Sequence, residues 1–209
     1  MFKFKTLLFK IFRLFTDSLH FLIQKNYRPS FKENPYRLPR RVYTLKDIDI
    51  IWLKNSGIKG IILDLDNTIV SEDDRYLSPG AEDWINQAKL AGLLFFILSN
   101  GKRRYRVKFW SHRLDIPTLS PAKKPFPSAF SRAMTYMQLP AKHVVVIGDS
   151  LHTDVVGAWL CGCRCIQVAS LPHPPRWWEK LAGKWVQIPY PEEAELWEFD
   201  AGVSYEKFF

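Results

Sequence analysis

The sequence predicts a doubly wound α/β fold, in which a parallel sheet is covered by helices on both faces. Short apolar runs alternate with helical stretches, and the runs lack the polar alternation of a strand with one exposed face. Acidic and hydroxyl side chains follow several runs, at the edge where ligands bind such a sheet. The 209 residues, 47% of them hydrophobic, suffice for one buried core with extensions. This composition excludes a disordered or fibrous protein.

The expected elements follow one another in a regular order. Four apolar runs are expected to form buried strands, at Gly60 to Asp66, Leu93 to Ser99, His143 to Asp149 and Arg164 to Ala169. The crossover helices are expected at Pro79 to Ala91, Lys102 to Arg113, Pro125 to Gln138 and Leu151 to Cys161. Several of them are opened by proline or closed by glycine, as helix ends often are.

Charge and composition divide the chain into three regions. We expect residues 1–45 to form a basic amphipathic helix and a proline-containing linker, residues 46–170 the α/β domain, and residues 171–209 an aromatic extension. The first 41 residues carry ten Lys or Arg against two acids, so the net charge of +9 belongs mainly to this end. Pro29, Pro35 and Pro39 predict that residues 26–45 cross the surface as a linker.

Residues 1–25 place apolar side chains at roughly helical spacing between cations. Their longest uncharged run, Ser18 to Gln24, has seven residues, whereas a membrane-spanning helix needs about 20. Such a helix can lie on an anionic phospholipid surface, with its cations on lipid phosphates. A helix that packs on the domain is an equal alternative, and an organellar transit peptide is a third.

The three cysteines, Cys161, Cys163 and Cys165, alternate within one predicted strand and so point along one face. Without a fourth ligand for a tetrahedral metal site, they are expected to be buried and reduced, as in a cytoplasmic protein. The positive charge alone suggests nucleic acid, but no base-reading or stacking motif accompanies it, so no nucleic-acid partner is expected. The sequence does not indicate an oligomeric state.

Two carboxylates, Asp64 and Asp66, lie two residues apart at the end of a predicted strand, and Thr68 follows. A carboxylate can attack a phosphate ester in line when a cation offsets the repulsion between them. We therefore expect Asp64 to be the nucleophile. Asp66 is expected to give a proton to the leaving alcohol and take one from the attacking water. Thr68 is expected to bind back to the loop and orient Asp66 in the phosphate site.

Ser99, Asn100 and Gly101 end the next predicted strand. The Ser99 hydroxyl is expected to bind the transferring phosphoryl group, beside Asn100 and a glycine that permits close backbone approach. Lys124 is expected to neutralise the nucleophile and the charge that develops during transfer. Lys123 is the competing candidate.

Asp149 and Asp154 complete the set after the third predicted strand. Because Mg²⁺ prefers carboxylate and carbonyl oxygens, we expect Mg²⁺ bound by Asp64, Asp149 and the backbone carbonyl of Asp66. Asp154 is expected to hold Lys124 or a metal-bound water in place. Each acidic residue alone could simply cap a helix, but their ordered combination favours a phosphate site.

In this order the motifs are similar to those of the haloacid dehalogenase superfamily, over about residues 58–170. Asp64-Leu-Asp-Asn-Thr68, Ser99-Asn100, Lys124-Pro125 and Gly148-Asp149 with Asp154 further resemble its YqeG-like branch, which includes phosphatidylglycerophosphate phosphatases. This resemblance implies dephosphorylation of that phosphorylated lipid headgroup at a membrane surface, by a peripheral enzyme. A phosphatase for a phosphoprotein or a soluble phosphometabolite is one alternative. A non-catalytic binding or signalling module is another.

The spacing between the motifs indicates how enclosed the substrate site is. Only 30 residues separate Thr68 from Ser99, and 24 separate Ser99 from Lys124, so neither gap holds both a crossover helix and a cap domain. An open site suits a headgroup in a bilayer, or a protein. Arg103 and Arg104 belong to a cationic run after Ser99 that could meet a second phosphate or an anionic surface, although a solvated helix face is the commoner explanation.

The extension at residues 171–209 is strongly aromatic. Such side chains suit a membrane interface or a partner surface, or they pack over the edge of the sheet, which we expect for the tryptophans. The aromatic residues concerned are Trp177, Trp178, Trp185, Trp197, Phe199, Phe208 and Phe209.

Overall fold

A computed structural model describes residues 40–175, 180 and 186–208. The amphipathic helix expected at residues 1–25 lies outside the described residues, as do most of the expected linker and Trp177, Trp178, Trp185 and Phe209. Within the described ranges, no helix is long and apolar enough to cross a membrane.

Six parallel strands form the central sheet, in the order β1-β7-β6-β2-β4-β5. Their bounds are Arg40–Arg41 (β1), Gly60–Leu63 (β2), Leu94–Leu98 (β4), Thr118–Leu119 (β5), Val144–Gly148 (β6) and Arg164–Gln167 (β7). Strand β2 lies between β4 and β6, with Ile62 opposite both Phe96 and Val146. The parallel sheet confirms the predicted fold class, and each of the four expected strands contains an observed one.

Helices connect the strands as crossovers. Their bounds are Ile50–Asn55 (α2), Ala81–Leu90 (α3), Arg104–Leu114 (α4), Pro127–Met137 (α5) and Val156–Cys161 (α6). Short 3-10 turns occupy Leu45–Asp47 and Ala141–His143. The helix expected from Leu151 starts as a π-helical turn, Leu151–Val155, before α6. Such wide turns are often found beside functional sites.

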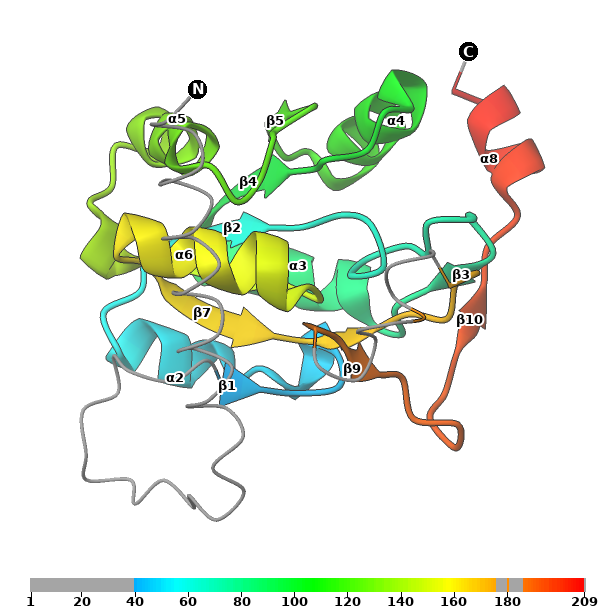
Figure 1. Ribbon diagram of the computed structural model, residues 1–209, viewed down its shortest axis with the longest axis horizontal. Coiled ribbons are helices and arrows are strands. Elements are labelled where there is room, and N and C mark those ends of the chain that lie inside the picture. The colour runs from blue at the N-terminus through cyan, green and yellow to red at the C-terminus, as the bar shows by residue number, and fades with distance from the viewer. Residues whose placement is uncertain (1–39, 176–179, 181–185, 209) are drawn as a thin grey trace, which may run out of the picture. The chain divides into compact units, whose positions relative to one another are not determined.

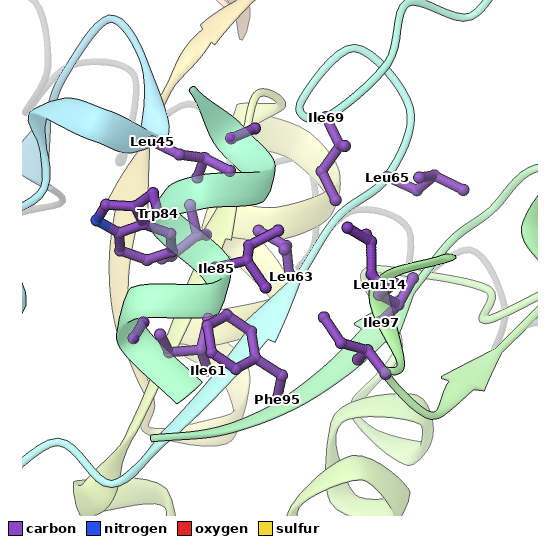
Figure 2. Close-up of a cluster of buried hydrophobic side chains, with 14 of the residues drawn as sticks. Leu45, Ile61, Leu63, Leu65, Ile69, Trp84, Ile85, Phe95, Ile97 and Leu114 are labelled. Carbon is purple, nitrogen blue, oxygen red and sulfur yellow. The ribbon is translucent and has the colours of Figure 1, made fainter. Parts of the chain in front are cut away.

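The sheet separates two apolar cores because neighbouring side chains on a strand point to opposite faces. Ile61 and Leu63 of β2 pack on the face that α3 and α4 cover, with Trp84 and Trp110. Figure 2 shows part of this cluster, in which Ile61, Leu63 and Ile85 lie together. Ile62 packs on the other face, in the cluster formed with α5 and α6. In Figure 1, α6 lies in front of the sheet and α3 behind it.

Strand β1 corrects part of the expected linker. Residues 26–45 were expected to cross the surface, yet Arg40 pairs with Ile166 at the edge of the sheet and Leu45 is completely buried. A two-residue strand is too short to show the alternation by which strands are found in a sequence. The α/β domain therefore includes residues before position 46.

All of the residues between Thr68 and Lys124 are described, and they form only β3 (Tyr76–Leu77), α3, β4, α4 and β5. The chain therefore has no cap domain in these two gaps, as the spacing predicted.

The described part of the aromatic extension packs on the domain. Strand β10 (Trp197–Glu198) pairs antiparallel with β3, and β9 (Ile188–Pro189) pairs parallel with β8 (Ala169–Ser170). The last helix, α8 (Ala201–Glu206), lies beside α4 at the right of Figure 1. Phe199 is buried and Phe208 packs against Phe109 of α4. Trp197 stays 40% exposed.

Candidate active site

Three strand ends bring the predicted residues to one edge of the sheet. Asp64 directly follows β2, Ser99 follows β4 and Asp149 follows β6. Leu63 is paired with Ile97 on one side and Ile147 on the other, so these three ends are in register. Their polar side chains therefore meet outside the carboxyl ends of neighbouring strands, where doubly wound sheets bind ligands.

Lys124 joins two carboxylates. Its Nζ lies 2.7 Å from Asp64 Oδ1 and 2.7 Å from Asp154 Oδ1, and all three side chains are buried. Burial lowers the pKa of Lys124, but attraction to Asp154 and Asp64 outweighs burial, so the pKa lies above its ordinary value. Burial, followed by repulsion from Asp154, raises the pKa of Asp64 well above its ordinary value despite Lys124. Lys124 is therefore protonated, and it lies beside the poorly solvated carboxylate of Asp64.

Asn100 explains why Lys124, and not its neighbour, reaches the site. The Asn100 Oδ1 accepts a hydrogen bond from Lys124 N at 2.8 Å, and its Nδ2 donates to Lys124 O at 3.1 Å. Lys123 is exposed, and its backbone has a φ of 58°. The Asn100 side chain, expected beside the phosphate, is thus used on the backbone of Lys124.

Asp149 is held by side chains from the end of β7 and from the segment that follows it. Its Oδ2 accepts hydrogen bonds from Ser170 Oγ at 2.7 Å and from Gln187 Nε2 at 3.0 Å. Its backbone carbonyl accepts one from Gln167 Nε2 at 2.9 Å. Burial and repulsion from Asp154 raise the pKa of Asp149 to about 7, although the Ser170 hydrogen bond opposes this.

A metal ion fits among the three buried carboxylates. Carboxylate oxygens of Asp64, Asp149 and Asp154 all lie within 4.8 Å of one another. When all three carboxylates are ionised, they and the Lys124 ammonium together carry two negative charges, and hard oxygen donors are what Mg²⁺ prefers. The expected ligand set had the Asp66 carbonyl in place of the Asp154 carboxylate, which the structure places within reach of the same point.

Both carboxylate oxygens of Asp66 have partners in the structure. Its Oδ2 accepts a hydrogen bond from Ser99 Oγ at 2.8 Å, and its Oδ1 forms an ion pair with Arg106. Thr68, expected to orient Asp66, is buried, and its Oγ1 has no hydrogen-bond partner within the described part of the chain. The Ser99 hydroxyl, expected to bind the phosphoryl group, donates its hydrogen bond to Asp66 in this structure.

Two glycines allow these close approaches. A Cβ on Gly101 would lie 2.9 Å from Ser99 Oγ and 3.1 Å from Asp66 Oδ2. A Cβ on Gly148 would lie 2.4 Å from Asp154 Cγ, which leaves no room for any other residue. The backbone N–H of Gly101 also donates to Ser99 Oγ at 2.9 Å. The absence of a side chain at Gly101 thus makes room for Ser99 and Asp66, while its expected approach to a phosphoryl oxygen stays a prediction.

The cationic run after Ser99 divides between buried and exposed positions. Arg103 donates to Asp74 Oδ2 at 2.7 Å and to the Glu72 carbonyl, whereas Arg104 is exposed. Arg106 is 1% exposed, so it cannot meet a membrane or a solvated substrate group. It falls three and four residues before the buried Phe109 and Trp110, so helical periodicity could have placed it on the buried face.

Sequence reasoning missed Asp74, Ser170 and Gln187, and gave Arg106 no role inside the site. Ser170 and Gln187 belong to no motif and lie 21 and 38 residues from Asp149. No local pattern connects residues that meet only after the chain has folded.

Comparisons with known proteins agree on one family. Residues 121–185 match a family model described as HAD-hydrolase-like. The chain is 45% identical over 116 residues to the "Probable phosphatase YqeG" of Bacillus subtilis (strain 168), covering 56% of this chain and 67% of that protein.

Two solved structures are also similar to the chain. A Corynebacterium glutamicum protein has 24% identity and a TM-score of 0.47, over 55% of this chain and 87% of its own. The cobalt-bound deoxy-D-mannose-octulosonate 8-phosphate phosphatase of Haemophilus influenzae has 19% identity and a TM-score of 0.45, over 57% of this chain and 73% of its own.

Proposed function

The chain belongs to the haloacid dehalogenase superfamily as a phosphatase of the branch that includes YqeG, and we propose that Asp64 is its nucleophile and phosphatidylglycerophosphate its substrate. The assignment of Asp64 as the nucleophile rests on its position. It follows the central strand β2, lies 2.7 Å from the Lys124 ammonium and has Asp149 and Asp154 beside it. A carboxylate so placed can attack phosphorus while a cation offsets the repulsion.

The reaction has two steps. A carboxylate oxygen of Asp64 attacks phosphorus in line, the bond from phosphorus to the ester oxygen breaks, and the leaving alcohol takes a proton from Asp66. Water then attacks the aspartyl-phosphate, Asp66 takes a proton from that water, and phosphate leaves as the Asp64 carboxylate is restored. Lys124 stays protonated throughout and neutralises charge on Asp64 and the phosphoryl oxygens.

Mg²⁺ would be held by the carboxylates of Asp64 and Asp149, with Asp154 and the Asp66 carbonyl as further oxygen donors. When bound, it supplies positive charge that lets an anionic ester approach an anionic site. The hydrogen bonds from Ser170 and Gln187 occupy Oδ2 of Asp149, so they orient this side chain before any ion arrives.

The substrate is proposed from what surrounds the open site. Lys123, next to Lys124, is exposed, and Phe126 is 61% exposed. Arg104, close to Ser99 in sequence, is exposed and Tyr105 is 41% exposed. Exposed cations mixed with aromatic rings suit the headgroup region of an anionic membrane. These features support a peripheral enzyme that acts on a phosphate still attached to lipid.

The test measures phosphate release from phosphatidylglycerophosphate in anionic liposomes with Mg²⁺, and from a soluble phosphomonoester. We expect Asp64→Asn to abolish turnover of both, and Arg104→Glu with Lys123→Glu to lower turnover of the liposomes about tenfold while sparing the soluble ester. Lys142→Glu, before β6 at the opposite edge of the sheet, serves as the matched charge control.

Each outcome separates the candidates. Turnover of soluble esters or a phosphopeptide without turnover of the lipid would keep the nucleophile and reject the lipid substrate. Turnover that survives Asp64→Asn would reject the proposed chemistry. If the protein releases no phosphate from any ester, the alternative of a non-catalytic binding or signalling module would be favoured.

A further inference from the structure

Arg106 is a buried cation that the reaction described above does not use. It is 1% exposed, although Arg104 and Lys108 on the same helix are exposed. Burying a guanidinium is unfavourable unless carboxylates and carbonyls satisfy its donors. Burial lowers the pKa of Arg106, but Asp66 and Asp74 outweigh it, so the pKa lies above its ordinary value. The charge is therefore fully retained inside the protein.

Within the described part of the chain, this guanidinium binds residues of the loop that begins at Asp66. Nη1 pairs with Asp66 Oδ1 and Nε with Asp74 Oδ1. Nη2 donates to the carbonyl of Ser71 at 2.8 Å and, more weakly, to that of Val70 at 3.4 Å. One side chain from α4 thus fastens both ends and the middle of the loop.

Asp74 is itself fixed from two further sides. Its Oδ2 accepts a hydrogen bond from Arg103, and its Oδ1 accepts one from the Tyr205 hydroxyl at 3.0 Å. Its backbone has a φ of 60°, in the left-handed region that costs a non-glycine residue about 1 kcal/mol. Aspartate adopts this region more readily than most residues do, and here the conformation places its carboxylate against Arg103, Arg106 and Tyr205.

Tyr205 connects this network to the carboxyl-terminal helix. Its ring lies 4.8 Å from that of Phe109 and 5.6 Å from that of Tyr105, between centroids, both on α4. Phe208 packs on Phe109 as well. In Figure 1, α8 accordingly lies alongside α4. The chain of contacts Tyr205–Asp74–Arg106–Asp66 therefore runs from α8 to the active site.

We propose that Arg106 is a positioning residue that holds the Asp66 carboxyl group in line with the leaving oxygen, and that Asp74 and Tyr205 hold Arg106. The proposal rests on the proposed role of Asp66 as general acid and base. Arg106 binds Oδ1 of Asp66 and Ser99 binds Oδ2, so the plane of the carboxyl group is fixed, and the second lone pair of each oxygen remains for the transferred proton. Proton transfer requires such alignment, and a misplacement of about 1 Å can cost a hundredfold in rate.

The decisive measurement is kcat/KM across aryl phosphates, from phenyl phosphate to dinitrophenyl phosphate, because this constant reports the steps up to loss of the alcohol. Phenolate needs a proton to leave, whereas dinitrophenolate does not. For Arg106→Lys we expect kcat/KM for phenyl phosphate to fall about a hundredfold and that for dinitrophenyl phosphate to fall less than about threefold. An equal fall for all esters would show a merely structural role and overturn the proposal.

A double-mutant cycle gives an independent readout on any ester that the wild type hydrolyses. If Arg106 acts through Asp66, adding Arg106→Lys to Asp66→Asn should lower the residual rate by less than about threefold. Full additivity would overturn the proposal. Tyr205→Phe keeps the ring and removes only the hydroxyl, so it should still fold if Arg106→Lys does not. For Tyr205→Phe we expect kcat/KM to fall about fivefold for phenyl phosphate and to stay nearly unchanged for dinitrophenyl phosphate. The effects of Tyr205→Phe and Asp66→Asn on the rate should again be non-additive.

Arg113→Lys is the matched control, since Arg113 lies on the same helix but pairs with Glu82 at 2.9 Å. It should leave the dependence on the leaving group unchanged. The Asp64→Asn variant distinguishes failure of the two proposals. If it still hydrolyses the esters, both the proposed function and this inference are rejected. If Asp64→Asn is inactive while Arg106→Lys slows all esters equally, only the positioning role fails.

Discussion

The side-chain amide of Asn100 brackets the backbone of Lys124, accepting from its N–H and donating to its carbonyl. Asn100 stands after β4 and Lys124 after β5, so this pair of hydrogen bonds joins two strand ends of the site. Asn100 therefore helps to position the Lys124 ammonium, although Asn100 itself contacts no reacting atom.

We therefore expect Asn100→Ala to lower kcat about tenfold and to change KM less, because the ammonium would lose its alignment with Asp64. Loss of two hydrogen bonds should also lower the free energy of unfolding by about 2 kcal/mol. Steady-state kinetics and thermal unfolding measure the two effects. Asn55→Ala, exposed at the end of α2, is the control, and an unchanged kcat in Asn100→Ala would contradict the assignment.

Lys124→Met should inactivate the enzyme and destabilise it. Removing this ammonium leaves Asp64 and Asp154 buried without a cation, which should cost about 3 kcal/mol in the absence of metal. Chemical denaturation in the presence of a metal chelator would measure the decrease in the free energy of unfolding. Lys54→Met, at an exposed position on α2, is the control for removal of a lysine elsewhere. A metal-free Lys124→Met as stable as the wild type would show that the two ion pairs are not formed.

Magnesium should stabilise the protein more at about pH 8 than at about pH 6. The pKa of Asp149 is raised to about 7, above that of the unfolded chain, so its contribution to metal-free stability is present at low pH and is lost as the pH rises through 7. Mg²⁺ requires the deprotonated carboxylate, so its binding strengthens over the same range. Melting temperatures with and without Mg²⁺ test this, and an increment that shrinks with rising pH would contradict it.

Ser170→Ala should weaken metal binding without harming the fold. The Ser170 hydroxyl donates to Asp149 Oδ2 at 2.7 Å, and such supporting contacts are worth about tenfold or more in metal affinity. The Mg²⁺ concentration for half-maximal activity should rise about tenfold while kcat at saturating Mg²⁺ changes little. Ser131→Ala, exposed on α5, provides the comparison, and an unchanged Mg²⁺ requirement would remove Ser170 from the site.

The residues of the strand ends could be predicted because two strong rules act on them. Buried parallel strands show as continuous apolar runs, and their carboxyl ends share one edge, so Asp64, Ser99 and Asp149 had to meet. The order of elements follows from the same runs. The predicted boundaries extend only one to three residues beyond the observed strands, as β2 ending at Leu63 instead of Asp66 illustrates.

What holds those residues could not be predicted in the same way. Arg106 stands among exposed cations, and only its partners Asp66 and Asp74 distinguish it from them. Gln187 meets Asp149 through a segment that carries no motif. Thr68 was assigned a hydrogen bond that Ser99 and Arg106 make instead. Such contacts depend on the packing of distant segments, which no local pattern encodes.

The three crowded carboxylates also have an evolutionary meaning. Burial and repulsion from Asp154 raise the pKa of Asp64 and of Asp149, so the charge on each of these two side chains lowers the stability of the metal-free protein. In a duplicate copy released from selection for catalysis, neutral replacements at these positions would bring a gain in stability at no functional loss. Drift should therefore remove these two acids early, and a descendant that retains both is one whose chemistry is still in use.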